Sequence, residues 1–329
     1  MNETLSRGEQ AILFLNRRGY NAFLTCRDCG EAVLCPRCSV SLTRHKERGR
    51  DYLLCHYCGY RSAIPHECPS CRSAHLAFMG YGTQKVEEAF GEKFGGAHHA
   101  SLLRMDADTT TKKSAYDELL GAFRAHKADV LLGTQMVAKG HDFPDVTLVG
   151  VLNADAALYL DDFRAGERTF SMLTQVIGRA GRAEKRGVAV IQTMNPNHEV
   201  IRLAAAQDYR AFYARDIALR EAFTFPPFCD IAVISAASAS EAACMKCAAD
   251  IFTFMKDKMS GDYRDVPVIS FGPFEAPLYK IEDCYRMRVV LKCRRSKRLL
   301  AMLGELLRHF TTKDYKAVSV GVDINPTNL

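Results

Sequence analysis

Hydrophobic positions along the first two thirds of the chain follow two alternating patterns. Short, continuous apolar runs that are rich in β-branched residues occupy residues 11–20, 101–108, 129–134, 146–155 and 187–193. Between these runs, residues 82–94 and 111–127 show the period of an amphipathic helix. One stripe of the second helix carries Ala115, Tyr116, Leu119, Leu120 and Phe123. This alternation predicts an α/β fold with a parallel sheet that has helices on both faces.

Beyond residue 210 the pattern changes to alternating strands and two long helices. Strands are predicted at 230–238, 266–271, 285–293 and 317–324, and helices at 241–259 and 296–310. The order β-α-β-β-α-β predicts an α+β, ferredoxin-like domain with a half-exposed antiparallel sheet. Cys244 and Cys247 fall within the first helix, with no second Cys-x-x-Cys pair nearby, so we interpret them as core residues.

A cysteine-rich segment interrupts the α/β pattern directly after its first strand. Four Cys-x-x-Cys pairs lie within 46 residues, and they are Cys26 with Cys29, Cys35 with Cys38, Cys55 with Cys58, and Cys68 with Cys71. Zinc binds four soft ligands in a tetrahedron, and one such pair supplies two of them. Eight thiols therefore predict two zinc ions per chain.

The spacing of the pairs suggests how they share the two ions. The pairs at 35/38 and 55/58 have the spacing of a zinc ribbon, and residues 39–54 between them read as a hairpin that turns at Gly49. The outer pairs at 26/29 and 68/71 would then close a second, enclosing site. We expect this nested arrangement, although sequential pairing is also open. Since eight thiols suffice, His45, His56 and His66 are interpreted as surface or hydrogen-bonded residues.

Composition places few limits on the partner but bears on the cysteines. The 329 residues are 48% hydrophobic and 25% charged, which is typical of a globular protein of two or three domains. A net charge of +6 is compatible with a nucleic-acid partner without requiring one. No apolar run reaches membrane-spanning length and no signal-peptide pattern occurs, so we expect a cytoplasmic protein. Thirteen cysteines in a reducing compartment favour metal binding over disulfides.

Two loop segments carry residues suited to phosphate chemistry. "GTQMVAKGHDFPDV" (133–146) follows a predicted strand, and "QVIGRAGR" (175–182) ends a predicted helix. Arg179 and Arg182 are three residues apart, so we expect both side chains on one face of the helix end, where they could clamp a phosphoryl group. A solvated helix face is the alternative. Gly178 and Gly181 count against it, because they weaken a helix unless something approaches closely.

Several segments resemble one family of helicases. "QVIGRAGR" resembles motif VI of superfamily 2 helicases, and "TQMVAKGHDFPDV" resembles their motif V. More particular are "FLNRRGY" with the cysteine-rich segment directly after it, "DADTT", "DFRAGERTF", "FPPF", "FGPFEAPLYKIEDCYRMRV" and "VDINP". Together, in this order, they resemble the primosomal protein N′ (PriA) family of bacterial replication-restart helicases over nearly the whole chain.

The resemblance implies an organisation and an activity. Residues 1–24 and 74–205 would form the second RecA-like lobe, 25–73 the zinc-binding insertion, and 210–329 a C-terminal domain that binds DNA at forks. The whole would be the C-terminal half of an ATP-dependent 3′-to-5′ DNA helicase that restarts stalled replication forks and initiates primosome assembly.

The resemblance also assigns roles to the motif VI and motif V residues. Arg182 would be the arginine finger, and Arg179 would bond the γ-phosphate of ATP. Gly140 and Asp142 would lie near the nucleotide.

Thr134 and Gln135 would lie where the DNA phosphate backbone passes. The implied partners are forked or single-stranded DNA, primosome proteins and single-stranded DNA-binding protein. We expect a monomer with no membrane association.

The sequence lacks the nucleotide-binding residues of such a motor. It contains no G-x-x-x-x-G-K-[ST] loop (Walker A), and Asp117 and Glu118 lie inside an amphipathic helix rather than at the strand end of a Walker B motif. ATP and Mg²⁺ are therefore expected only with a first helicase lobe, and the chain alone is expected to be inactive. The alternative is a zinc-dependent DNA- or protein-binding module without a motor. Thiol redox chemistry would need an exposed, reactive cysteine pair.

Overall fold

The computed structural model describes residues 1–15, 23–47, 50–79, 83–95, 100–106, 109–110, 114–134, 137, 143–160, 162–181 and 186–328. The chain divides into two compact units. The first comprises Met1–Ala22 and Gly80–Asp216, and the second comprises Phe23–Met79 and Ile217–Leu329. No described helix is both long and apolar enough to cross a membrane.

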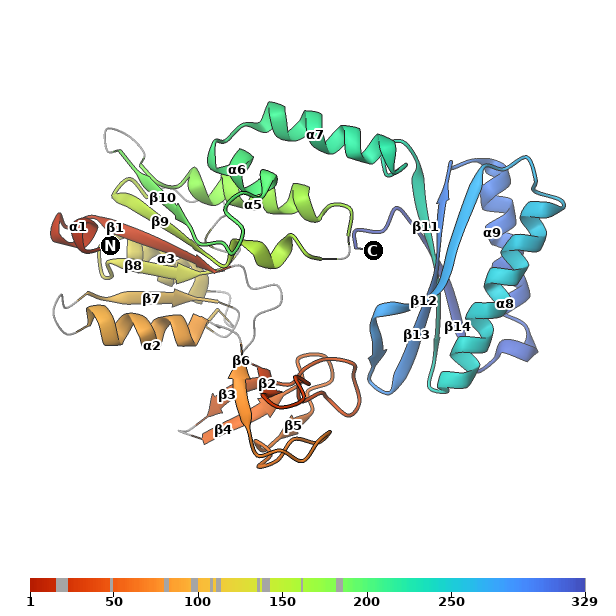
Figure 1. The fold of residues 1–329 in the computed structure, drawn as a ribbon, viewed down its shortest axis with the longest axis horizontal. Coiled ribbons are helices and arrows are strands. Elements are labelled where there is room, and N and C mark those ends of the chain that lie inside the picture. Colours follow the sequence, from red (N-terminus) through yellow and green to blue (C-terminus); the bar gives the residue numbers. More distant parts are fainter. Residues whose placement is uncertain are drawn as a thin grey trace. The chain divides into compact units, whose positions relative to one another are not determined.

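The first unit is built on a five-stranded parallel sheet (Figure 1). The strand order is β10-β9-β1-β8-β7, with β1 (Gln10–Leu15) at the centre. The other strands are β7 (Leu102–Met105), β8 (Val130–Gly133), β9 (Val146–Leu152) and β10 (Val188–Ile191). All four pairings are parallel, which confirms the predicted parallel sheet.

Helices α1 (Asn2–Ser6), α2 (Thr83–Phe94), α3 (Ala115–Arg124) and α5 (Ala165–Ile177) contact strands of this sheet. The 3₁₀ helix η1 (Ala154–Ala157) and α6 (Glu199–Ala205) pack against α5, and α7 (Tyr209–Ala222) follows α6 along the chain. The predicted stripe of α3 faces inward, since Leu120 and Phe123 are buried. In α5, Phe170, Leu173 and Val176 recur at helical spacing and join the same core.

The cysteine-rich segment forms a small antiparallel sheet in the second unit. Its strand order is β5-β4-β3-β2-β6. The strands are β2 (Phe23–Cys26), β3 (Thr43–Glu47), β4 (Arg50–Leu54), β5 (Arg61–Ser62) and β6 (Leu76–Met79). β3 and β4 pair as the predicted hairpin, while its expected turn residue, Gly49, lies outside the described residues. Because β2 pairs with β6, the insertion is closed at its base by its own first and last strands.

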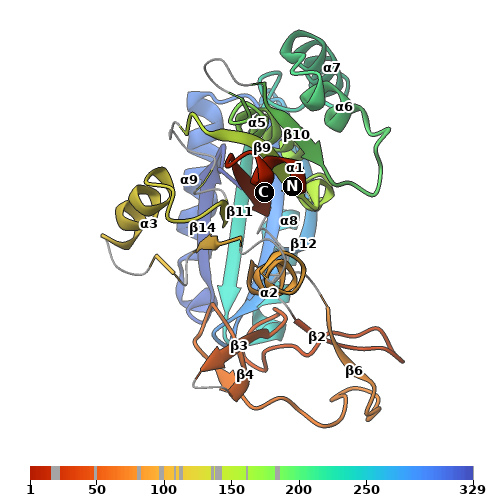
Figure 2. The ribbon, with the colours of Figure 1, turned by 90° about the vertical axis from the view of Figure 1, so that its left-hand side faces the viewer.

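The rest of the second unit has the ferredoxin-like order of strands. β11 (Asp230–Ser238), β12 (Val268–Ile281), β13 (Cys284–Cys293) and β14 (Ser319–Ile324) form an antiparallel sheet in the order β12-β13-β11-β14. Helices α8 (Glu241–Ser260) and α9 (Lys297–Phe310) cover one face of this sheet (Figures 1 and 2). The short 3₁₀ helix η2 (Lys313–Tyr315) precedes β14. The predicted β-α-β-β-α-β order is therefore present.

Local sequence signals explain how α8 and α9 begin. Ser240 and Ser296 precede the two helices, and each hydroxyl accepts a hydrogen bond from the backbone N–H three residues later. Cys244 and Cys247 are fully buried in α8, where burial raises the pKa of Cys247 to about 11. Both side chains belong to the core, as their helical spacing suggested.

Candidate metal centres and nucleotide site

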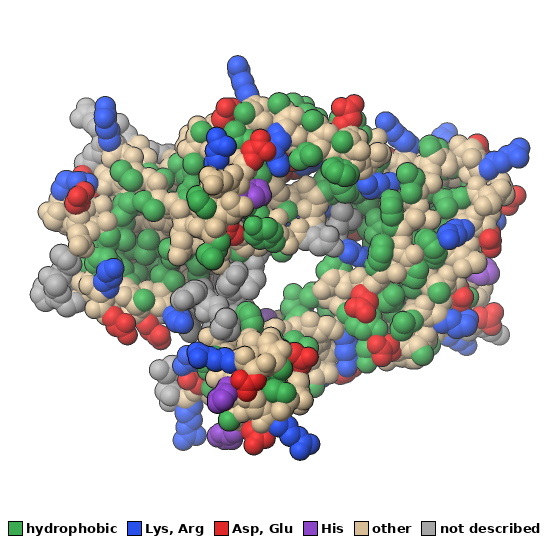
Figure 3. All heavy atoms as spheres, in the orientation of Figure 1, with side chains coloured by type: hydrophobic (Ala, Val, Ile, Leu, Met, Phe, Trp, Pro, Cys, Tyr) green, Lys and Arg blue, Asp and Glu red, His purple; other side chains and the backbone are tan. Residues whose placement is uncertain are grey.

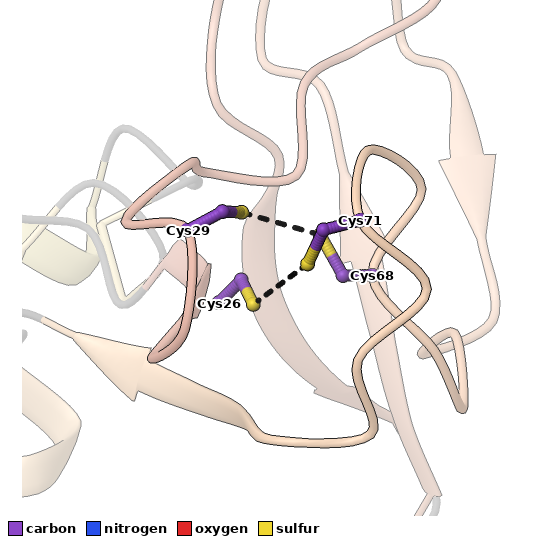
Figure 4. Close-up of side chains that lie close together, drawn as sticks. All are labelled: Cys26, Cys29, Cys68 and Cys71. Atoms are coloured by element: carbon purple, nitrogen blue, oxygen red, sulfur yellow. Dashed lines mark hydrogen bonds between the residues drawn. The ribbon is translucent and has the colours of Figure 1, made fainter.

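Four cysteines from the two ends of the insertion meet in an outer cluster. Cys26 ends β2 and Cys29 lies in the turn that follows, while Cys68 and Cys71 lie in a turn before β6. The Sγ atoms of Cys26 and Cys71 are 3.6 Å apart, and those of Cys29 and Cys68 are 3.7 Å apart. Figure 4 shows the four side chains pointing toward one another from these two turns.

The other four cysteines form an inner cluster around the β3–β4 hairpin. Cys35, Cys38 and Cys55 are buried and Cys58 is half-buried. The Sγ atoms of Cys35 and Cys58 are 3.7 Å apart. The sulfur atoms are thus grouped in the nested order, with the two middle pairs in one cluster and the two outer pairs in the other.

Both clusters have the dimensions of a tetrahedral zinc site. All four sulfur atoms of each cluster lie within 4.8 Å of one another. Zn–S bonds of about 2.3 Å in a tetrahedron place the sulfurs about 3.8 Å apart, which is close to the measured separations. A disulfide would need sulfurs about 2.05 Å apart, and all of these cysteines are free thiols. The residues therefore fit a structural zinc ion with four thiolate ligands.

Three of the four Cys-x-x-Cys turns close in the same way. The residue after the second cysteine adopts a left-handed backbone and donates its N–H to the carbonyl oxygen of the first cysteine. These residues are Gly30, Gly59 and Arg72, with φ of 77°, 71° and 61° and N···O distances of 3.0, 2.9 and 2.9 Å. Glycine adopts this conformation at no steric cost. The turn at Cys35 and Cys38 lacks this closure.

Polar side chains tie the two outer turns together. Asp28, between Cys26 and Cys29, accepts a hydrogen bond from the Ser73 hydroxyl at 2.5 Å and lies 3.2 Å from Nδ1 of His75. The bond from Ser73, then that with His75, lowers the pKa of the Asp28 carboxyl. Sequence reasoning missed this contact, because only the fold brings Asp28 and Ser73 together.

The histidines of the insertion stay outside both clusters. The Nε2 atoms of His45 and His56 lie 3.1 Å apart, and their rings meet edge to face. His66 is exposed. Among the described residues, the groups of His, Cys, Asp or Glu side chains that could hold a metal ion are the two cysteine clusters, and neither contains a histidine.

The segment predicted to bind phosphate begins where α5 ends. The helix stops at Ile177, and Arg179 lies in a turn in which its backbone N–H donates to the Val176 carbonyl at 3.0 Å. Gly181 has a left-handed backbone, with φ of 66°, and donates its N–H to the Val146 carbonyl at 3.0 Å. The turn is thereby attached to the first residue of β9. Arg182 lies outside the described residues.

The end of the other phosphate segment reaches the same place. Val146 donates its N–H to the Phe143 carbonyl at 3.2 Å while its own carbonyl accepts from Gly181. The two segments therefore converge at the amino end of β9. Thr134 is buried directly after β8, at the opposite, carboxyl edge of the sheet.

The remaining expected residues of the motif V segment are not placed. Gln135, Gly140 and Asp142 lie outside the described residues.

Buried carboxylates at the carboxyl edge of the sheet were not foreseen as structural groups. Asp106 follows β7, is fully buried and accepts from the Thr83 hydroxyl at 2.5 Å. Asp155 follows β9 and accepts from the Thr193 hydroxyl at 2.7 Å. A carboxylate directly after a buried strand was the available signal. Each anchors a loop at the edge where α/β sheets bind ligands.

Three family models match successive parts of the chain. Residues 35–62 match the "PriA DNA helicase Cys-rich region (CRR) domain", and residues 78–184 match the "Helicase conserved C-terminal domain". Residues 221–327 match the "Primosomal protein N C-terminal domain". The Bacillus subtilis (strain 168) replication restart protein PriA is 44% identical over 99% of this chain and 39% of its own length. The chain belongs to the PriA family.

A second curated relative and one solved structure are also similar to parts or all of the chain. The Haemophilus influenzae replication restart protein PriA is 36% identical over 100% of this chain and 44% of its own length. The chain thus spans less than half of each of these two PriA proteins. A solved Pyrococcus furiosus Hef helicase domain is 14% identical over 63% of this chain and 26% of its own, with a TM-score of 0.28.

The PriA family model also bears on the metal. Its Cys-rich region, residues 35–62, contains all four cysteines of the inner cluster, and those of the outer cluster flank it. Together with the two four-sulfur clusters, this match shows that the chain carries a zinc-binding module.

Basic residues of the PriA C-terminal domain gather where β13 passes into α9. Arg294, Arg295 and Lys297 are exposed there. Lys292 has a structural contact, since its Nζ donates to the Phe223 carbonyl at 2.6 Å and lies 4.0 Å from the ring centroid of Phe225. Figure 3 shows Lys and Arg side chains projecting from both the insertion and the C-terminal domain.

Proposed function

We propose that the chain is the second motor lobe, zinc insertion and C-terminal domain of an ATP-dependent 3′-to-5′ DNA helicase. In this function it restarts stalled replication forks in the cytoplasm and initiates primosome assembly. The observation that carries the proposal is the convergence of the two helicase segments at Val146, on a parallel sheet with the family's zinc insertion. Family membership supports the biological role.

The residues of the turn after α5 act on the nucleotide. Arg182 is the arginine finger, Arg179 bonds the γ-phosphate, and Gly140 and Asp142 lie near the nucleotide. A guanidinium fixed before reaction stabilises the charge of the phosphoryl group without reorganisation. The bond from Gly181 to Val146 supports this role because it fixes the backbone next to both arginines.

ATP with Mg²⁺ supplies the phosphoryl group, and a first lobe must hold it. The chain contains no Walker A sequence to cradle the phosphates. The lobe described here contributes positioning and positive charge only.

Each cysteine cluster holds one zinc ion, so the chain binds two. Four thiolates fill a tetrahedron and leave no open position, which is the arrangement of a structural site. Zinc therefore stabilises the insertion and does not activate water. Such sites contribute about 10–16 kcal/mol of apparent binding free energy, which is folding free energy for a small module.

DNA is the macromolecular substrate, in forked or single-stranded form. On the motor lobe, the DNA phosphate backbone passes Thr134 and Gln135. On the C-terminal domain, the exposed Arg294, Arg295 and Lys297 neutralise phosphates. Primosome proteins and single-stranded DNA-binding protein are the protein partners of a monomer.

A reconstitution tests the motor assignment. The first lobe of the Bacillus subtilis relative is added to this chain, and DNA-stimulated ATPase is measured for wild type, Arg182→Ala and Arg186→Ala. We expect ATPase only with the added lobe, and its loss by about 10³-fold or more in Arg182→Ala. Arg186→Ala removes a neighbouring exposed arginine as the matched control. ATPase from the chain alone would overturn the assignment, whereas DNA binding with no ATPase in any mixture would favour the motorless module.

A further inference from the structure

The tip of the β12–β13 hairpin contacts the one Cys-x-x-Cys turn that lacks its own closure. Ser39, the residue after Cys38, donates its backbone N–H to the Lys280 carbonyl at 2.8 Å. In the other three turns the corresponding N–H bonds within the turn. In the opposite direction, the Asp283 backbone N–H donates to the Arg37 carbonyl at 2.9 Å. Two reciprocal backbone bonds thus join segments about 240 residues apart in the sequence.

A third backbone bond reaches the sulfur itself. The N–H of Glu282 donates to Sγ of Cys38 at 3.2 Å. In the other turns, the second cysteine receives this kind of bond from the residue two positions further along its own turn. The pairs are Glu31 to Cys29, Tyr60 to Cys58, and Ser73 to Cys71. At Cys38 the Glu282 amide takes the place of the local donor.

Side chains add to the same contact. The Arg37 guanidinium and the Asp283 carboxylate are 2.8 Å apart. Nζ of Lys280 lies 3.2 Å from Asp283 and donates to the Pro36 carbonyl at 3.2 Å. Ile281 packs against the apolar cluster that contains the inner cysteines. The hairpin tip is therefore bound by backbone, charged and apolar groups together.

The conformation of the tip also indicates that it is held from outside. Glu282 and Asp283 form a two-residue turn, with φ of 49° and 61°. Turns of this geometry favour Asn-Gly, because side chains disfavour φ above zero. A glutamate and an aspartate persist in this region when the surroundings fix them. The surroundings here are the Cys35–Cys38 turn.

We propose that the β12–β13 tip, residues 280–283, is the outer wall of the inner zinc site and positions Cys38 as a ligand. The inference rests on the zinc assignment of the proposed function. It makes the inner ion a joint between the insertion and the C-terminal domain, because the Cys35–Cys38 turn both supplies ligands to the ion and binds the hairpin tip. Removal of the inner ion frees the hairpin tip, and displacement of the hairpin tip loosens the inner ion.

The first half of the test follows the hairpin after removal of either ion. Cys58→Ser removes a ligand of the inner cluster, and Cys29→Ser removes one of the outer cluster as the matched control. Hydrogen–deuterium exchange of the full chain is then compared over residues 280–284. Amide exchange is expected to accelerate about tenfold or more in Cys58→Ser and to stay at the wild-type rate in Cys29→Ser.

The second half follows the inner ion after changes in the hairpin. In the Cys29→Ser chain, which keeps only the inner ion, zinc release to a colorimetric chelator is timed. Asp283→Ala is expected to speed release roughly threefold, since the exposed ion pair is modest. Glu282→Pro deletes the N–H donor and also displaces the tip, because proline cannot adopt the left-handed φ of this residue, so zinc release is expected to become about tenfold faster or more. Asp265→Ala is the control, because Asp265 pairs with Arg298 at 2.7 Å at similar exposure.

The outcomes separate the two levels of inference. Zinc analysis of wild type comes first, and fewer than two ions per chain would defeat the zinc assignment itself. If two ions bind but the hairpin exchanges equally fast in both cysteine variants, the joint is overturned and the zinc assignment stands. Amide exchange of α8 in Glu282→Pro shows whether the C-terminal domain is folded in this variant. If it is not folded, Asp283→Ala decides. Zinc release at the wild-type rate in Asp283→Ala then counts against the proposal.

Discussion

Gly181 donates its backbone N–H to the carbonyl oxygen of Val146 at 3.0 Å, and this bond attaches the turn after α5 to the sheet. The turn depends on glycine at two places. Gly181 itself has φ of 66°. A Cβ at Gly187 would come within 2.2 Å of the Ala180 carbonyl carbon. The backbone from Arg179 to Gly181 is therefore held by a left-handed residue and by a close approach of Gly187 that a side chain there would prevent.

Replacement of Gly181 should destabilise the first unit. Gly181→Ala places a side chain in the left-handed region, at a cost of about 1–2 kcal/mol in the free energy of unfolding. Gly121→Ala is the matched control, because Gly121 lies in α3 with open space at its Cβ, and alanine there should stabilise by about 0.5–1 kcal/mol. Urea titration of the zinc-loaded chain measures both. Shifts of the same sign would contradict the assigned role of Gly181.

The cysteine clusters predict which substitutions release the same ion. Zinc analysis of the purified chain should return two ions. Cys26→Ser and Cys68→Ser should each release the outer ion, because their sulfurs belong to one cluster. Cys35→Ser and Cys55→Ser should release the inner ion. A double variant distinguishes nested from sequential pairing. Cys26→Ser combined with Cys35→Ser should lose both ions if the sites are nested. If this double variant keeps one ion, the pairing is sequential.

Much of the fold followed from local pattern. The five strands of the first unit and its helices α2 and α3 appear where apolar runs and helical stripes predicted them, because burial on both faces of a parallel sheet demands continuous apolar strands. The cysteine spacing predicted the zinc module for a similar reason, because each Cys-x-x-Cys turn supplies two ligands and is a local feature of the sequence.

Contacts between segments that are distant in the sequence could not be predicted from the local pattern. Strand order β10-β9-β1-β8-β7 is set by which edges pair, and no periodicity encodes it. We expected Arg179 on a helix end, yet α5 stops two residues earlier, because Gly178 and Gly181 favour a turn. The bond from Glu282 to Cys38 joins residues 244 apart, where neither sequence pattern indicates the other.

Acid should selectively weaken the attachment of the last strand to β11. Asp230 accepts hydrogen bonds from Nδ2 of Asn325 and from the Arg295 backbone N–H, both at 2.8 Å. The Asn325 bond, then that from Arg295, lowers the pKa of the Asp230 carboxyl in the folded protein. Because the folded pKa is the lower one, this stabilisation is complete above the ordinary pKa of about 3.9 and is lost as pH falls through the folded value.

The measurement compares unfolding free energies of wild type and Asp230→Asn between about pH 6 and about pH 3. Asp230→Asn should cost about 1–2 kcal/mol near neutrality, and the difference should shrink toward the acid end. Acid release of zinc affects both proteins alike. Asp262→Asn, at a carboxylate that is 80% exposed, serves as control. A difference that is constant with pH would exclude ionisation of Asp230 as its source.

Basic side chains of the C-terminal domain that bind phosphate should influence the salt dependence of DNA binding. Arg294 and Lys297 are exposed at the start of α9, whereas Lys292 and Arg298 are engaged by Phe223 and Asp265. Removal of one side chain that neutralises a phosphate should reduce the slope of log affinity against log salt concentration by about 0.7–0.9. Arg294→Ala and Lys297→Ala should each do so for single-stranded and forked DNA, with little dependence on sequence.

A control of equal charge makes this result interpretable. Lys246→Ala also removes one positive charge, but Lys246 lies on α8 and pairs with Asp250 at 2.9 Å. Long-range electrostatics would lower affinity equally in all three variants, whereas direct binding to phosphate lowers the salt slope only in the first two. Fluorescence anisotropy of a labelled oligonucleotide at several salt concentrations provides the slopes. Equal slopes in Arg294→Ala, Lys297→Ala and wild type would remove the basic residues at α9 from the DNA interface and leave the motor lobe and the zinc insertion as its remaining candidates.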